Sequence, residues 1–358
     1  MTGASRPLCA ALVAIALAGA GCKRAHAKQR WGIGVATFDA TALGLARART
    51  PDPFVDAIRP GRLGIPTYDG SNQATHPDVL LERDAAGAPH LTMAMTPYPY
   101  SDEQFENPCL LVSSDGTSFA PAPGAPVPLV PPPPYDHNDD PDLRRDPRTG
   151  EYELLYLETL RPDRQTLVAL RSRDKITWTR RDAIVYDLKA GAQFIVSPAA
   201  IDEGGVTHLF YVDADVTRRV IYAMTSADGV TWDPHSAAPI QLAMGAVDPT
   251  GEGPRPAGKA VGVPTPPDRL SPIKAWHVDV IRGDGAYGLL FSGYEEADGF
   301  KHQNLYLATS PDLVTWTLRA EPLLSWKDPA LGVDTLYRST GVVEHGTLVV
   351  WYAMQYRE

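Results

Sequence analysis

The stretch Trp276-His277-Val278-Asp279-Val280-Ile281 places two polar side chains two positions apart, followed by apolar residues. The same arrangement recurs in four other places, although one copy has alanine at the second position: His76-Pro77-Asp78, Asp140-Pro141-Asp142, Ser197-Pro198-Ala199 and Arg338-Ser339-Thr340. Residues two apart on a strand point to one face. We therefore predict five inner strands around a shared axis, with the paired side chains gathered in one funnel.

A second motif joins a serine, an Asp-containing turn and an aromatic residue, and it occurs at residues 113–119, 172–178, 226–232 and 310–316. The aspartate can bond the turn backbone, and the aromatic residue can fix the hairpin to its neighbour. Apolar strands between the two motifs complete four-stranded meanders. Such repeats, tens of residues long, are typical of propellers. The predicted fold is all-β, a five-bladed β-propeller.

The fifth blade begins at Arg338 but lacks outer strands before the chain stops at Glu358. Residues 31–38 alternate like a third strand, so we expect them to close the ring beside residues 347–356. Residues 31–358 then form a single propeller domain. The alternative is that residues 31–38 are a loose tail.

Residues 1–22 contain an early arginine, a short apolar run and small residues before Cys22, which predicts a lipoprotein-type signal peptide. Cys22 is the expected lipidation site, although Gly19 stands where lipoproteins usually have leucine. The alternative is plain cleavage near residues 25–27. Residues 23–30 would be a tether. We expect an exported protein, anchored at the outer membrane or surface by lipid, or otherwise periplasmic or secreted.

Composition narrows the partners. A formal net charge of −10 and the absence of a long Lys/Arg run argue against nucleic acid. Beyond the predicted signal and lipidation point only Cys109 remains, so no intramolecular disulfide is expected. We expect a monomer that acts on an oligo- or polysaccharide.

The residues quoted above resemble the five-bladed propeller glycoside hydrolases, which include arabinanases and xylosidases (family 43) and invertases and levansucrases (families 32 and 68). The resemblance rests on the blade repeats, the Ser-x-Asp turns and the inner-strand aspartates. It implies three acidic residues on separate inner strands: a base or nucleophile, a pKa-tuning aspartate and a general acid. Asp78 matches the first and Asp142 the second.

The third position departs from the family, because Ser197 stands where family 43 usually has a glutamate. Asp279, one blade further on, is the expected third catalytic residue. Loop carboxylates could also reach the funnel, and the candidates are Glu106, Glu158 and Glu295. Glycoside cleavage needs two carboxylates, one of them protonated. For each inner-strand aspartate, the alternative is a cap that bonds neighbouring backbone.

The remaining funnel residues are predicted to bind substrate. The polar members are His76, Glu106, His137, Asp140, His277, Glu295 and Arg338, and the aromatic members are Tyr98, Trp276 and Tyr337. The histidines could instead join the aspartates around a divalent cation such as calcium. Arg338 indicates an anionic group on the ligand or an internal salt bridge to Asp279.

The leading interpretation is an exported glycoside hydrolase that uses Asp78, Asp142 and Asp279. A second enzyme interpretation is a metal-assisted hydrolase or a glycoside phosphorylase, favoured by the histidines and Arg338. A third is a surface lipoprotein that binds glycans without cleaving them, having lost the acid at Ser197.

Overall fold

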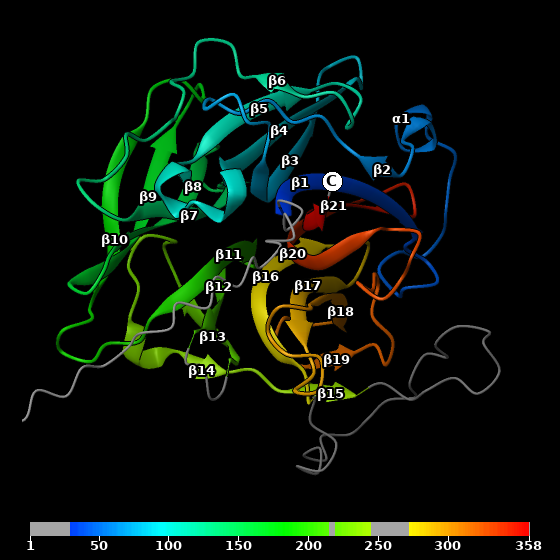
Figure 1. The fold of residues 1–358 in the computed structure, drawn as a ribbon. Coiled ribbons are helices and arrows are strands. Elements are labelled where there is room, and N and C mark those ends of the chain that lie inside the picture. The colour runs from blue at the N-terminus through cyan, green and yellow to red at the C-terminus, as the bar shows by residue number, and fades with distance from the viewer. Residues whose placement is uncertain (1–28, 215–218, 245–271, 358) are drawn as a thin grey trace, which may run out of the picture.

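Five sheets surround a common axis in the computed structural model, which describes residues 29–214, 219–244 and 272–357 (Figure 1). Blades 1 to 3 are four-stranded antiparallel meanders. Blade 1 consists of β3 (Ala74–Arg83), β4 (Pro89–Pro97), β5 (Cys109–Ser113) and β6 (Ala120–Pro121). Blade 2 consists of β7 (His137–Arg145), β8 (Tyr152–Leu160), β9 (Arg164–Ser172) and β10 (Thr179–Asp187). Blade 3 consists of β11 (Ile195–Glu203), β12 (Val206–Asp213), β13 (Ile221–Ser226) and β14 (Ala238–Pro239).

Blade 4 has a fifth strand, β15, which pairs in parallel with β19. The repeats did not predict this strand. The strands of the last two blades are, for blade 4, β16 (Lys274–Arg282), β17 (Tyr287–Tyr294), β18 (Asn304–Ser310), β19 (Trp316–Leu318) and β15 (Leu242–Met244); for blade 5, β20 (Val333–Glu344), β21 (Thr347–Arg357), β1 (Gln29–Asp39) and β2 (Gly61–Arg62). The inner strands β3, β7, β11, β16 and β20 each contact the next, and β20 contacts β3. The predicted five-bladed propeller is confirmed.

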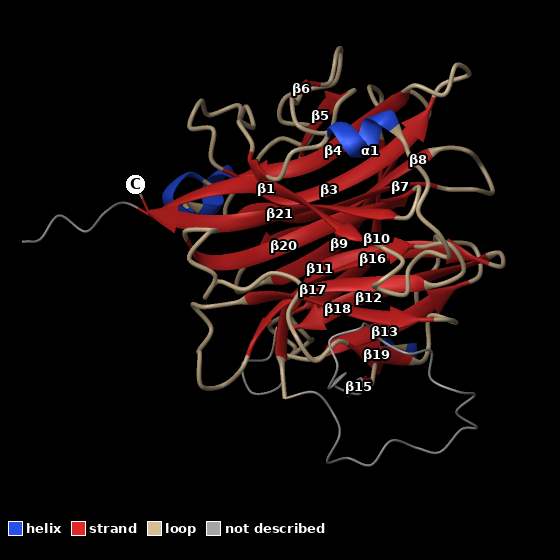
Figure 2. Ribbon diagram, turned by 90° about the vertical axis from the view of Figure 1, so that its right-hand side faces the viewer, coloured by secondary structure: helices blue, strands red, loops and turns tan. Residues whose placement is uncertain are grey.

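The N-terminal strand closes the ring as predicted. β1 pairs with β21 along its whole length, from Gln29 opposite Arg357 to Asp39 opposite Thr347. Figure 2 shows β1, β21 and β20 running side by side. Ile33 and Val35 of β1 are completely buried, so the strand contributes to the core as well as to the sheet.

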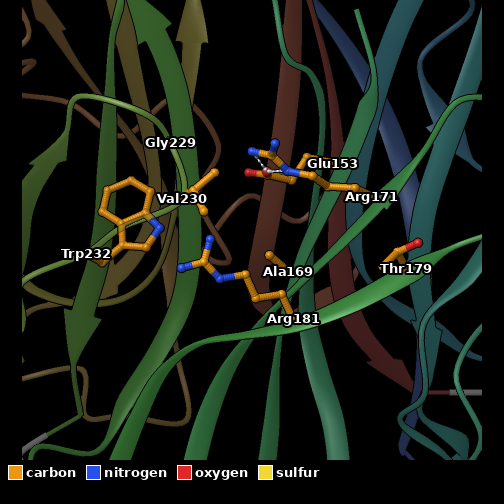
Figure 3. Close-up of a pocket in the computed structure, with 8 residues that line it drawn as sticks. All are labelled: Glu153, Ala169, Arg171, Thr179, Arg181, Gly229, Val230 and Trp232. Carbon is orange, nitrogen blue, oxygen red and sulfur yellow. Dashed lines mark hydrogen bonds and ion pairs between the residues drawn. The ribbon is translucent and has the colours of Figure 1, made fainter. Parts of the chain in front are cut away.

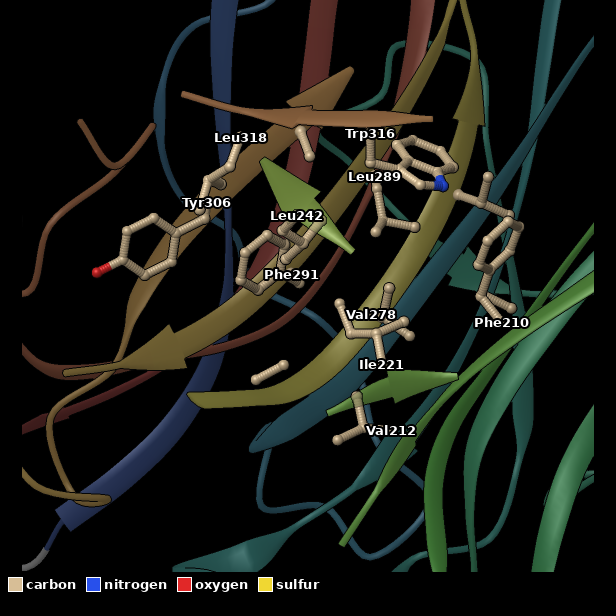
Figure 4. Close-up of a cluster of buried hydrophobic side chains, with 14 of the residues drawn as sticks. Phe210, Val212, Ile221, Leu242, Val278, Leu289, Phe291, Tyr306, Trp316 and Leu318 are labelled. Atoms are coloured by element: carbon tan, nitrogen blue, oxygen red, sulfur yellow. The ribbon is translucent and has the colours of Figure 1, made fainter. Parts of the chain in front are cut away.

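Apolar side chains fill the spaces between blades, and the cluster between blades 3 and 4 is drawn in Figure 4. Trp316, which ends the Ser-x-Asp turn of blade 4, is 1% exposed and packs edge-on against Phe210 of blade 3. The turns themselves form as predicted. In blade 1, for example, the Asp115 carboxylate accepts the backbone N–H groups of Thr117 and Ser118. These motifs are therefore structural.

Helices are few and short in the described residues: α1 (Pro53–Ala57), η1 (Pro99–Ser101), η2 (Glu103–Phe105) and η3 (Pro234–Ser236). None of them is long and apolar enough to span a bilayer. The predicted signal peptide and the lipidation site Cys22 lie outside the described residues, as does nearly all of the predicted tether.

All five inner strands have a bulge that the two-residue alternation did not predict, and in three of them the bulge contains a residue followed by proline. Strand pairing shifts register between Thr75 and Asp78, between Asp139 and Asp142, and between Val196 and Ala199. Within each shift, the residue before proline has a left-handed backbone: His76, Asp140 and Ser197 have φ of 50°, 52° and 58°. A bulge of this kind changes the direction in which a side chain points.

Ring closure can be tested by truncation. A chain that lacks residues 1–28 should melt at the temperature of the full chain, because β1 is kept. A chain that lacks residues 1–39 should unfold or melt much lower, because it exposes the edge of β21 and loses buried side chains such as Ile33, each worth roughly 2–5 kcal/mol. Thermal melting of both chains is the measurement, and equal melting temperatures would show that β1 is not needed for closure.

Candidate functional site

The three predicted catalytic aspartates meet near the axis. One carboxylate oxygen of each of Asp78, Asp142 and Asp279 lies within 4.8 Å of the others, and each residue is 4% exposed. We call these residues the aspartate cluster. Their meeting shows that the strands bring them together. Their catalytic role remains a prediction.

Two members of the aspartate cluster bond the neighbouring inner strand. Asp78 accepts the backbone N–H of Leu143 on blade 2 and the hydroxyl of Thr340 on blade 5. Asp142 accepts the backbone N–H of Ala200 on blade 3, at 3.1 Å. These are the bonds of the capping alternative, because they join the inner strands of adjacent blades.

Crowded carboxyl groups tend to keep protons. Burial, followed by the charge of Asp78, raises the pKa of Asp279 to about 8. Burial also raises the pKa of Asp78, and it raises that of Asp142 well above its ordinary value. Arg338 is completely buried beside them, with Nη2 3.9 Å from Asp142 Oδ1. Burial disfavours its charge, but the surrounding carboxylates outweigh this effect and raise its pKa.

A second group, the histidine layer, consists of His76, Asp140 and His277. Asp140 Oδ1 lies 3.1 Å from His277 Nδ1, 3.5 Å from His76 Nε2 and 3.4 Å from Arg338 Nη1. Burial alone would raise the pKa of Asp140, but these neighbours outweigh it and hold the pKa far below its usual range. His76 lacks exposure to water, and burial keeps its pKa well below normal. Asp140 is therefore an ionised group enclosed by its partners.

A third group lies nearer to solvent and is here called the mouth cluster: Glu106, His137 and Asp139. One ligand atom of each lies within 4.8 Å of the other two, and the residues are 4%, 5% and 8% exposed. His137 Nδ1 is 3.9 Å from Glu103, whose side chain is 46% exposed. His76 Nδ1 is 3.6 Å from Glu106 Oε1, which joins this cluster to the histidine layer.

The mouth cluster has opposite charges in contact. Burial first, and then the charges of Asp139, Asp140 and Glu103, raise the pKa of Glu106 well above its ordinary value, although His137 opposes the shift. Burial would lower the pKa of His137, but Asp139, Glu106 and Asp136 outweigh it and raise it to about 10. Asp139 Oδ2 is 3.2 Å from His137 Nε2, while its Oδ1 is buried with no hydrogen-bond partner.

Aromatic side chains cover the histidine layer. The Tyr337 ring lies 4.1 Å from that of His277 and 5.5 Å from that of His76, measured between centroids. Trp276 donates from Nε1 to the Tyr337 hydroxyl at 2.9 Å. Tyr98 packs on Trp31 at 5.2 Å. The three predicted aromatic residues are thus placed around the loop end of the axis.

Two predicted loop carboxylates do not reach this region. Glu158 forms two hydrogen bonds to Arg180 on β10. Glu295 is exposed, and its charge acts on Tyr306 of β18, away from the inner strands. Ser197, at the position of the missing acid, bonds both backbone groups of Val278 through its hydroxyl. It therefore joins blades 3 and 4.

Asp139 was not among the predicted site residues, although it precedes Asp140 directly. Strict alternation places neighbouring residues on opposite faces. The bulge removes this constraint: Asp139 pairs with Leu157 and Asp142 with Leu155, and these partners share a face because they are two residues apart. Within this shift, Asp140 before Pro141 has a left-handed backbone, with φ of 52°. The recurring x-Pro pair was the signal in the sequence.

The histidine layer does not fit calcium, which prefers oxygen ligands. Its two imidazoles and one carboxylate have the composition of a transition-metal site. However, the Arg338 guanidinium already contacts the same Asp140 oxygen as both histidines, at 3.4 Å, and would repel a dication. These contacts favour an acid–base site over a cation site.

Blades 2 and 3 line a separate, partly open pocket of about 180 Å³ near the Ser-x-Asp turn of blade 3 (Figure 3). Ala169, Val230 and Trp232 supply apolar lining. Arg171 reaches it as well, but its Nη2 is paired with Glu153 at 2.7 Å. None of the inner-strand site residues lines this pocket, so it is not part of the axial site.

Comparison with known proteins supports the fold. No family model matches the chain, and no curated protein matches it in sequence. Among solved structures, a thermostable family-43 glycoside hydrolase has 10% identity, covers 79% of this chain and 88% of its own, and has a TM-score of 0.51. A putative glycoside hydrolase from Parabacteroides distasonis has 14% identity, coverage of 87% and 98%, and a TM-score of 0.51.

A third similar structure belongs to the family-130 mannoside phosphorylases, a family described as containing glycoside hydrolases that target β-1,2 mannosidic linkages in Candida mannan. It has 16% identity, coverage of 86% and 93%, and a TM-score of 0.50. At these identities the likeness establishes a shared fold. The chain therefore shares a five-bladed propeller fold with these structures, as the resemblance predicted.

The protonation of Asp279 predicts a pH dependence of stability. Its pKa is near 3.8 in the unfolded chain and about 8 in the folded one, so the folded state binds more protons and stability falls as pH rises from about 4 to about 8. Asp279→Asn removes this loss. The melting temperature of Asp279→Asn minus that of the unchanged protein should therefore increase from pH 5 to pH 9. Thermal melting of both proteins at several pH values in this range is the measurement.

Asp228, in the Ser-x-Asp turn of blade 3, is the matched control. Hydrogen bonds from Thr231 and Val230 lower its pKa, so its contribution to stability is present above pH 4 and lost in acid. Asp228→Asn should therefore destabilise at neutral pH. An Asp279→Asn variant that behaves like Asp228→Asn would show that Asp279 is ionised in the folded protein.

Proposed function

We propose that this protein cleaves glycosidic bonds, with Glu106 as the proton donor and Asp139 as the ionised carboxylate. The observation that carries the proposal is that both carboxyl groups approach His137 Nε2, Glu106 at 3.8 Å and Asp139 at 3.2 Å, with one oxygen of each within 4.8 Å of the other. Two carboxyl groups this close cannot both ionise easily, so one keeps its proton. Burial raises the pKa of both groups, but that of Glu106 is raised more strongly, and the charge of His137, which is bonded to Asp139, opposes the shift of Asp139.

The roles follow from the chemistry of glycoside hydrolysis. Protonated Glu106 donates its proton to the leaving oxygen. Asp139 Oδ1, which is buried and has no hydrogen-bond partner, is the oxygen that would attack the anomeric carbon of a sugar that reaches it. Water then attacks the glycosyl ester after Glu106 has taken a proton from it, which releases the sugar and restores both groups. A spacing near 5 Å between carboxyl groups is typical of such double displacement, which retains the anomeric configuration.

The other groups support this pair. Asp140 is enclosed by His76, His277 and Arg338, so it acts by orienting His76 against Glu106. The aspartate cluster lies two residues further along the inner strands than the histidine layer. Its bonds to neighbouring backbone suggest that Asp78 and Asp142 mainly hold the ring together. We place the acid–base pair in the mouth cluster for these reasons.

Export and attachment through a lipidated Cys22 remain part of this proposal. The N-terminal pattern supports them, and an oligo- or polysaccharide outside the cell would be the substrate.

A second candidate is glycan binding without cleavage. It is favoured by Ser197, whose hydroxyl joins blades 3 and 4 at the position where family 43 has its acid. The low exposure of the mouth cluster also favours it, since a reacting group has to meet the substrate.

Leaving-group dependence tests the proposed roles. Glu106→Gln should lose about 100-fold or more in kcat on glycosides with sugar leaving groups. It should lose much less on dinitrophenyl glycosides, because their leaving group departs without protonation. Asp139→Asn should lose activity on both kinds of substrate, because the attacking group is gone. The measurement is kcat/KM on a panel of aryl glycosides and oligosaccharides, with the active substrate chosen from the unchanged protein.

Glu103→Gln is the control, because Glu103 is a nearby carboxylate that pairs with Arg161. It should keep most of its activity. Equal losses of Glu106→Gln on both leaving groups would remove Glu106 as the acid. Binding of glycans by the unchanged protein without any product would instead establish the second candidate.

A further inference from the structure

Arg219 is a buried cation with no anionic partner in the described part of the chain. The residue is 8% exposed, and its Nε and Nη1 have no hydrogen-bond acceptor. The two other buried arginines of the described residues are neutralised: Arg144 by Glu153 and Asp202, and Arg338 by the inner-strand aspartates. A buried unpaired charge is costly. Arg219 therefore differs from the other two buried arginines, which are paired with carboxylates.

The surroundings of Arg219 are aromatic. Its guanidinium carbon lies 4.0 Å from the ring centroid of Phe300, 4.6 Å from that of Trp276 and 5.5 Å from that of Tyr294. Rings of this kind partly compensate a cation. They also offer flat apolar faces of the sort that stack against sugar rings. The combination is a guanidinium with unused donors inside an aromatic wall.

This wall belongs to the loop end of the axis. The Arg219 carbonyl accepts the backbone N–H of Ala275, which fixes it beside the start of β16. Trp276 then connects it to the site, because its Nε1 donates to Tyr337, whose ring covers His277. Arg219 also has a left-handed backbone, with φ of 49°. Strain of this kind persists where the surrounding structure enforces it.

We propose that Arg219 binds the carboxylate of an acidic sugar, so that the glycan recognised at the loop end of the axis contains a uronic acid. A carboxylate offers oxygen acceptors to the guanidinium, and the adjacent rings accept the sugar face. The inference deepens the proposed function and rests on it only in placing a glycan at the loop end of the axis.

The test compares acidic and neutral sugars of the same shape. Methyl glycosides of glucuronate and galacturonate are titrated by calorimetry against those of glucose and galactose. We expect at least one uronate to bind about tenfold or more tightly than its neutral counterpart, the gain of a charge-assisted hydrogen bond. Arg219→Gln should abolish this preference, whereas Arg219→Lys should keep part of it. Arg181→Gln, which removes an exposed arginine of β10, should leave it unchanged.

Binding is measured in a Glu106→Gln background, so that turnover does not interfere. Whether the proposed function is wrong is decided by a separate experiment, in which the unchanged protein would form no product. The uronate proposal is overturned if neither uronate binds more tightly than its neutral counterpart, or if the preference survives Arg219→Gln. Tighter binding of glucose 6-sulfate than of glucuronate would assign a sulfate ester to Arg219 and overturn the carboxylate.

Discussion

The site depends on one backbone feature, the left-handed residue before proline in three adjacent inner strands. His76, Asp140 and Ser197 adopt this conformation in blades 1, 2 and 3. Such a residue costs on the order of 1–3 kcal/mol when it is not glycine. The ring repays this cost with hydrogen bonds between blades, such as that from the Ser197 N–H to Asp140 Oδ2 at 2.8 Å. Strain and inter-blade bonding are thus parts of one arrangement.

The bulges also separate the charges into layers. Asp140 is turned toward two histidines and Arg338, which hold its pKa far below the usual range, whereas Asp142, two residues on, meets two other aspartates and has its pKa raised well above the ordinary value. Asp139, one residue before, reaches the mouth cluster. One short run on β7 therefore supplies carboxyl groups to three environments, and their pKa values diverge because their neighbours differ.

Much of the fold could be predicted from the sequence, because the blade repeats are local and each carries its own turn chemistry. The pairing of residues 31–38 with the last strand followed from counting strands. The parallel strand β15 was missed because three residues carry no periodic signal. In the site, the meeting of Asp78, Asp142 and Asp279 was predicted. Asp139 was missed because alternation fails at a bulge, and Arg219 because its isolation is a property of packing.

The proposed chemistry requires that Glu106 holds a proton at neutral pH while Asp139 does not. Difference infrared spectroscopy measures this directly, since a protonated carboxyl group has its own C=O stretching band. We expect Glu106→Gln to remove a protonated-carboxyl band at pH 7 and Asp139→Asn to remove a carboxylate band. Loss of the protonated band in Asp139→Asn, with no such loss in Glu106→Gln, would contradict this expectation.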